Sequence, residues 1–77
     1  MSARRQWVFL DPCGCAIGVS EAGSNESRSK AFRDHYDTAR ERNAAIDRGV
    51  TAELVDHDRY VAEFMPQMYS SWVCPHR

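Results

Sequence analysis

The chain lacks a long apolar run and an excess of either charge. Its 77 residues contain no apolar stretch near the roughly 18 residues that a membrane-spanning helix requires. Ten Lys and Arg residues against eleven Asp and Glu residues give a net charge of -1, so the positive field that supplies most non-specific affinity for nucleic acid is missing. We therefore expect a cytoplasmic protein for which nucleic acid and membranes are unfavourable partners.

Sequence patterns of the common catalytic sites are also missing. The chain has no glycine-rich phosphate loop, no Ser-His-Asp set with a nucleophile elbow, and no His-x-Glu pattern of the zinc deaminases. So short a chain also has little material with which to shield a substrate from water. We predict that the protein is not an enzyme.

The cysteines are few, and all three lie in tight groups, a CGC sequence at residues 13–15 and a CPH sequence at residues 74–76. Together the groups offer three thiols and one imidazole, the ligand number of a closed tetrahedral zinc site. Such an ion would stabilise a domain that, at this size, buries only about 60% of the surface of its unfolded chain. We predict one Zn²⁺ bound by Cys13, Cys15, Cys74 and His76.

Other interpretations of these residues stay open. The first two cysteines could be small buried hydrophobic residues, and a disulfide would leave one thiol of the odd number unpaired. His35 and His57 are rivals of His76 as the fourth ligand. Otherwise His35 would lie at the solvent edge of a helix, and His57, between two aspartates, would belong to a polar helix cap.

The first half of the chain predicts a hairpin followed by a helix. Residues 7–10 are aromatic and β-branched, residues 11–15 have turn chemistry, and residues 16–19 are again apolar and extended, which predicts a β-hairpin with two thiols at its tip. A loop then leads to a helix N-cap, and residues 29–48 have helical periodicity up to a glycine cap at Gly49. The candidates for the N-cap are Ser24, Asn25 and Ser27. The residues expected on the buried face of this long helix are Phe32, Tyr36, Ala39 and Ile46.

The second half predicts one more strand and a short helix. Residues 50–55 alternate, with Val50, Ala52 and Leu54 on one face of a third antiparallel strand. Asp56 or Asp58 would cap a short helix that Pro66 ends. We predict a single small α+β domain over residues 1–77, stabilised by zinc and frayed over residues 1–6.

The chain resembles small zinc-binding proteins of actinobacterial phages, of the mycobacteriophage type. The resemblance is carried by the combination of residues 7–15, the helix, residues 49–56 and the CPH group. The resemblance spans most of the chain. It implies a setting, the cytoplasm of an infected bacterial host cell, and carries over no catalytic or binding residue.

We predict that the protein is a small protein-binding module that docks on a bacterial host protein and modulates it. The motivation is a surplus of aromatic and methionine side chains in the last third of the chain, which either meet a partner or pack against the sheet. The residues predicted to contact the partner are Tyr60, Phe64, Met68 and Tyr69.

Two alternatives belong to other functional classes. One is a structural, homo-oligomeric protein. The other is a nucleic-acid-binding zinc domain that uses a local basic patch. The residues of that patch would be Arg4, Arg5, Arg28, Lys30 and Arg33.

Overall fold

A computed structural model describes residues 4–23, 27–69, 72–73 and 75. It contains a three-stranded antiparallel sheet with the strand order β2-β1-β3, so that the first strand of the chain is the central one. The strands are β1 (Arg5–Leu10), β2 (Ala16–Glu21) and β3 (Thr51–Asp56). The predicted α+β fold is confirmed.

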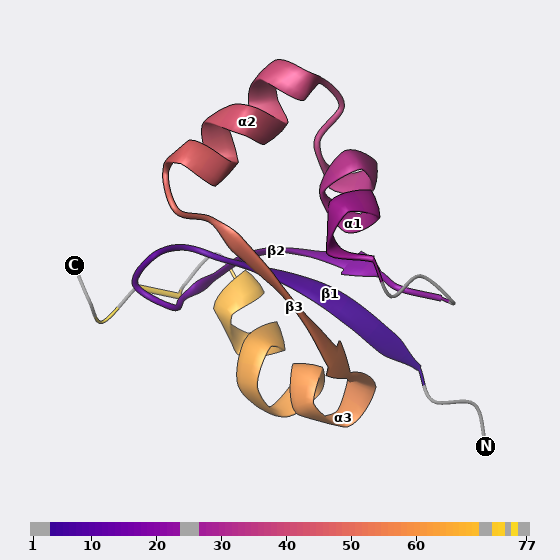
Figure 1. The fold of residues 1–77 in the computed structure, drawn as a ribbon. Helices are drawn as coiled ribbons and strands as arrows, with labels where there is room; N and C mark the ends of the chain where they lie inside the picture. The colour runs from indigo at the N-terminus through magenta and orange to yellow at the C-terminus, as the bar shows by residue number, and fades with distance from the viewer. Residues whose placement is uncertain (1–3, 24–26, 70–71, 74, 76–77) are drawn as a thin grey trace.

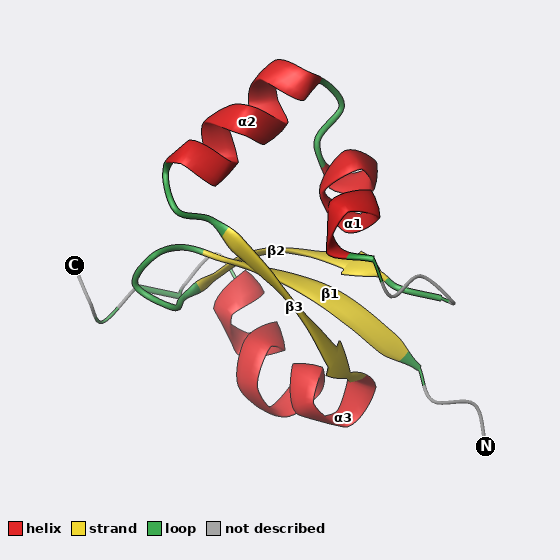
Figure 2. Ribbon diagram, in the orientation of Figure 1, coloured by secondary structure: helices red, strands yellow, loops and turns green. Residues whose placement is uncertain are grey.

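Helices cover both faces of the sheet (Figures 1 and 2). On one face lie α1 (Arg28–His35) and α2 (Ala39–Asp47). On the other lies a continuous helical run that consists of α3 (His57–Arg59), the π-helical turn η1 (Tyr60–Phe64) and the 3₁₀ turn η2 (Met65–Met68). Within the described ranges, no helix has both the length and the apolar character needed to cross a membrane.

The predicted hairpin is present, with residues 13–15 at its tip. The backbone N–H of Asp11 donates to the carbonyl of Cys15 at 2.9 Å, and the N–H of Gly14 donates to the carbonyl of Asp11 at 2.8 Å. Gly14 has a φ of 93°, a conformation that side chains with a Cβ rarely adopt. β1 also begins earlier than expected: Arg5 and Gln6, predicted to be frayed, pair with Asp56 and Val55.

The central strand is buried on both faces because each face has its own hydrophobic cluster. Successive side chains of a strand point to opposite faces, so Trp7 and Phe9 reach the α1–α2 layer while Val8 reaches the other helical layer. The first cluster consists of Trp7, Phe9, Ala22, Ala31, Phe32, Ala45, Val50 and Ala52. The second consists of Val8, Ala16, Val55, Tyr60 and Phe64.

The single long helix predicted over residues 29–48 is wrong, since the chain forms two helices there. Tyr36 is extended, with φ -104° and ψ 121°, and its ring stacks on Phe32 with centroids 6.0 Å apart. The Thr38 side chain then accepts a hydrogen bond from the backbone N–H of Glu41 at 3.1 Å and begins α2. Thr-x-x-Glu is the sequence of a capping box, so the break had a local signal that the periodicity of the apolar residues obscured.

The other helix ends lie at predicted positions, with one exception. Ser27 caps α1, Asp56 caps α3 through the N–H of Arg59, and Gly49 follows α2 with a φ of 91°. Pro66, however, does not end the last helix. The N–H of Met65 bonds to the carbonyl of Tyr60, five residues back, and proline is tolerated in the first turn of the following 3₁₀ segment, where its missing N–H costs nothing.

Candidate functional site

The structure describes two of the four predicted zinc ligands, and Cys74 and His76 lie outside the described residues. At the hairpin tip Cys13 is exposed and Cys15 is buried. Over the part of the chain that the structure describes, no group of three or more His, Cys, Asp or Glu side chains is placed to hold a metal ion. The zinc site therefore stays a prediction.

This prediction has a direct measurement. We expect elemental analysis of protein purified without chelator to find about one zinc per chain, because three thiolates and one imidazole complete a tetrahedral shell. Cys13→Ser should lose most of the metal, whereas His35→Gln, outside the predicted set, should keep it. A zinc-free preparation that still unfolds cooperatively would contradict the zinc site.

The two rival histidines have packing roles. The His35 ring stacks on Phe9 with centroids 4.2 Å apart and an interplanar angle of 17°. A Cβ at Gly18 would lie 2.9 Å from two atoms of that ring, so the glycine leaves room for the stack. The Nδ1 of His57 lies 3.0 Å from Nε2 of the buried Gln6, while Asp56 is the helix cap. His35 is thus a partly buried residue against the core rather than a solvent-edge one.

Burial of His35 makes a pH dependence of stability testable. Desolvation lowers the pKa of His35 below its ordinary value of 6.5 in the folded protein, so the unfolded chain takes up the proton more readily. The contribution to stability is therefore complete above the unfolded pKa and is lost as the pH falls through the folded pKa. We expect the melting temperature to fall more steeply in wild type than in His35→Gln between about pH 7.5 and about pH 5. Parallel profiles would contradict this role.

The residues predicted to contact a partner are mostly in the core. Tyr60 and Phe64 are 9% and 7% exposed and belong to the second cluster, and Met68 packs against it. Of the four, Tyr69 keeps a largely exposed side chain, at 60%. Tyr60, Phe64 and Met68 therefore pack against the sheet, which was the alternative to contact with a partner.

The basic residues of the predicted patch do not line one surface. The Arg4 guanidinium pairs with Glu21, and its hydrogen bond lowers the pKa of that carboxyl. The ammonium of Lys30 pairs with Asp34 at 2.9 Å. Arg28 and Arg33 line a groove between the α1–α2 layer and β3, whereas Arg4 lines a different pocket.

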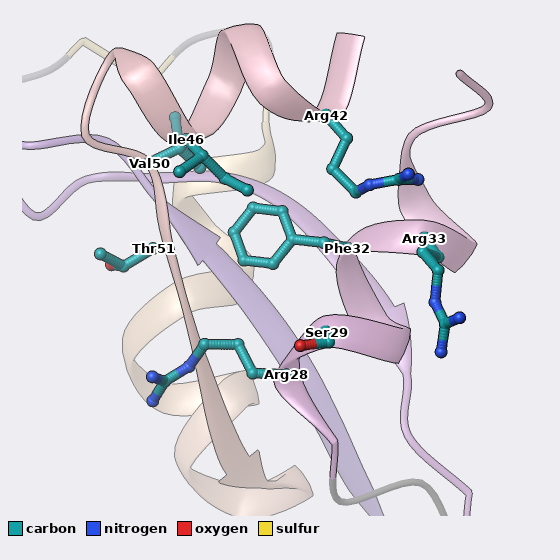
Figure 3. A pocket seen from close by; sticks show the side chains of 8 residues that line it. All are labelled: Arg28, Ser29, Phe32, Arg33, Arg42, Ile46, Val50 and Thr51. Atoms are coloured by element: carbon teal, nitrogen blue, oxygen red, sulfur yellow. The ribbon is translucent and has the colours of Figure 1, made fainter. Parts of the chain in front are cut away.

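This groove is a concave site formed by both helices of the α1–α2 layer and the start of β3 (Figure 3). Its volume is about 660 Å³, within the range of about 300–1,000 Å³ that is usual for ligand pockets. Residues from α1, α2 and the start of β3 surround it, and none of the eight lining residues is acidic. They are Arg28, Ser29, Phe32, Arg33, Arg42, Ile46, Val50 and Thr51.

The centre of the groove is apolar. Phe32 and Val50 are buried, at 6% and 4% exposed, and form its floor, while the side chain of Ile46 remains 50% exposed. The predicted long helix would have buried Ile46 together with Phe32. Because the helix is interrupted at residues 36–38, Ala45 is buried instead and Ile46 lines the groove.

Three arginines stand around this apolar centre. Figure 3 shows Arg33 and Arg42, from different helices, on one side of Phe32, and Arg28 on the side toward Thr51. The Nε of Arg28 donates to the carbonyl of Ala52 at 3.0 Å. Among the described residues, Arg33 and Arg42 have no acidic partner within ion-pair distance, so their charges are not neutralised there.

Sequence reasoning missed this site because it depends on the turn between the two helices. Arg42 and Ile46 are one turn apart on α2, and Phe32 and Arg33 are neighbours on α1, so no short motif unites them. Comparisons of the chain with models of known protein families, with curated proteins and with solved structures found no match.

Proposed function

We propose that the protein is a protein-binding module whose α1–α2 groove receives a segment of a partner. In the setting that the resemblance to phage proteins implies, the partner is a bacterial host protein whose activity is modulated by the docking. The observation that carries the proposal is a half-exposed Ile46 in a groove that is lined by buried apolar residues and three arginines and by no acidic residue.

Folding alone does not account for this arrangement. Phe32 and Val50 belong to the first cluster and also line the groove with Ile46, so the apolar surface continues from the core into the groove and then meets solvent. Exposed apolar surface rimmed by polar residues is typical of protein interaction sites. Arginine is enriched at such sites, because its planar guanidinium forms paired hydrogen bonds and its stem packs on apolar groups.

A protein partner fits the groove better than nucleic acid does. Unspecific single-strand binding combines a positive groove with aromatic side chains on which bases stack. The aromatic residue of this groove, Phe32, is only 6% exposed and offers no free ring face. The net charge of -1 also opposes a phosphate polymer at longer range.

The proposal is tested by site-specific crosslinking in bacterial cells. A photoreactive phenylalanine analogue is placed at Ile46 in the groove or at Val61, which has similar exposure, at 41%, and lies in η1 on the opposite face of the sheet. We expect a discrete adduct from position 46 only, and we expect excess unlabelled wild-type protein to suppress it. The captured protein is then purified and its affinity measured by calorimetry.

The affinity measurement separates specific docking from chance capture. Ile46→Glu should weaken binding by about tenfold or more, because it places a charge on the apolar centre of the contact. Val61→Glu is the matched control and should bind as wild type does. Equal adducts from both positions, or an unchanged affinity of Ile46→Glu, would refute the proposed function.

A further inference from the structure

We propose that the segment received by the α1–α2 groove is acidic and amphipathic, with an apolar side chain on Ile46 and carboxylates on either side of it. This inference rests on the proposed function and specifies the chemistry of the partner. The juxtaposition that carries it is a half-exposed Ile46 in the same groove as three arginines, with the Arg33–Arg42 pair on one side of Phe32 and Arg28 on the other.

Charge complementarity selects an acidic segment. Guanidinium groups stay protonated at any physiological pH, so the lining of the groove carries three fixed positive charges and no negative one. A carboxylate matches the two parallel N–H groups of a guanidinium, which gives geometric selection in addition to attraction. A basic segment would instead meet like charges at close range.

The surroundings of Arg42 and Arg28 sharpen this preference. Arg42 is only partly exposed and lies beside the apolar centre, where a docked segment would exclude water from its pair. The bond from Arg28 Nε to the Ala52 carbonyl holds that side chain along β3, and a guanidinium has four further N–H donors. Preorganised donors of this kind lose less conformational entropy on binding.

The positions of the arginines also predict the order of residues in the segment. Since Arg33 and Arg42 lie on one side of Phe32 and Arg28 on the other, acidic residues should precede and follow the apolar one. An amphipathic helix with contacts spaced three or four residues apart meets this requirement in a groove between helices.

A second copy of this chain cannot supply the acidic segment through the same surface. In a two-fold symmetric contact each groove would face the other, which would place arginines against arginines. Dimerisation and oligonucleotide binding are therefore outcomes that the experiment must be able to reveal.

The test is selection of random peptides of about 12 residues, long enough for three helical turns, displayed on particles and selected on the full chain at about 50 mM salt. Peptides that bind wild type but not Ile46→Glu are groove-dependent. We expect these to carry net negative charge with an apolar residue between acids, and their affinity to fall by about tenfold or more when the salt is raised to about 300 mM.

Two charge-reversed proteins provide the matched comparison. Arg33→Glu with Arg42→Glu should select peptides of net positive charge. Arg40→Glu with Arg48→Glu makes the same change of net charge at exposed positions on and beside α2 that do not line the groove, and should select acidic peptides as wild type does. Circular dichroism checks that each protein folds. If Arg33→Glu with Arg42→Glu does not fold, Arg33→Gln with Arg42→Gln replaces it. The glutamine variant should lose the preference for acidic peptides without gaining one for basic peptides.

The outcomes distinguish this inference from the function on which it rests. Groove-dependent peptides that are neutral or basic would overturn the acidic partner while leaving protein binding intact. The absence of any groove-dependent peptide would overturn both. A duplex oligonucleotide that binds wild type but not Ile46→Glu, or a dimer seen by light scattering that Arg33→Glu with Arg42→Glu dissociates, would also overturn the inference.

Discussion

Replacing Phe9 by alanine is expected to lower the free energy of unfolding by about 3–5 kcal/mol, the range for large aromatic residues in protein cores. Phe9 is completely buried in the central strand. Its ring meets Phe32 edge to face at 5.3 Å, stacks on His35 at 4.2 Å and meets Tyr36 at 6.1 Å. The substitution removes the side chain through which the central strand contacts these three rings. In a small domain few other side chains can move into the cavity that it leaves.

Urea denaturation measures this loss. Phe9→Leu is the graded comparison and should cost less, about 1–2 kcal/mol, because most of the apolar volume stays in place. If Phe9→Ala unfolds at the same urea concentration as wild type, the packing of the α1–α2 layer on β1 is not as described. A loss that exceeds the total stability would appear as an unfolded protein, and Phe9→Leu would then carry the measurement.

Phe64→Ala is expected to cost about 3 kcal/mol through the opposite face of the sheet. Phe64 is 7% exposed, packs in the second cluster, and has the Arg59 guanidinium 5.5 Å from its ring centroid. A cation at that distance adds a smaller attraction, of about 0.5–1 kcal/mol at an exposed site. The side chain therefore acts mainly in folding, and partner binding should change only as far as folding does.

Tyr69→Ala is the matched control for Phe64→Ala. Tyr69 belongs to the same stretch and was predicted for the same role, yet its side chain is 60% exposed. Its removal should change the free energy of unfolding by less than about 0.5 kcal/mol. Equal stability losses in the two variants would contradict the different burial of these residues, and an unchanged stability in Phe64→Ala would return it to the partner-binding candidates.

Folding and binding thus involve largely different side chains. The two clusters hold Phe9 and Phe64, whereas the arginines that border the groove belong to neither cluster. Exposed ion pairs elsewhere, such as Arg59 with Glu53 and Glu63, each contribute at most a few tenths of a kcal/mol, because water and salt screen them. Substitutions of Arg33 and Arg42 should therefore affect docking much more than stability.

Local chemistry in the sequence was enough to predict the hairpin and the third strand, and it included the start of α1, the end of α2 and the start of α3 among its candidate caps. The turn at residues 11–15, the caps at Ser27 and Asp56 and the glycine at Gly49 depend on hydrogen bonds and dihedral angles within a few residues. Such features can be read directly because the atoms concerned are neighbours in the chain. The capping sequence at Thr38 is of the same kind, but the longer periodicity of the apolar residues predicts one uninterrupted helix across it.

Tertiary structure decided what each apolar and basic side chain does. Tyr60 and Phe64 became core residues because a second helical layer packs on the sheet, and His35 became a stacking partner because Gly18 leaves space beside Phe9. Ile46 entered a groove among arginines because α1 and α2 separate at residues 36–38. Burial depends on which distant segments meet, and those contacts are set by the packing of whole elements rather than by the order of residues within one of them.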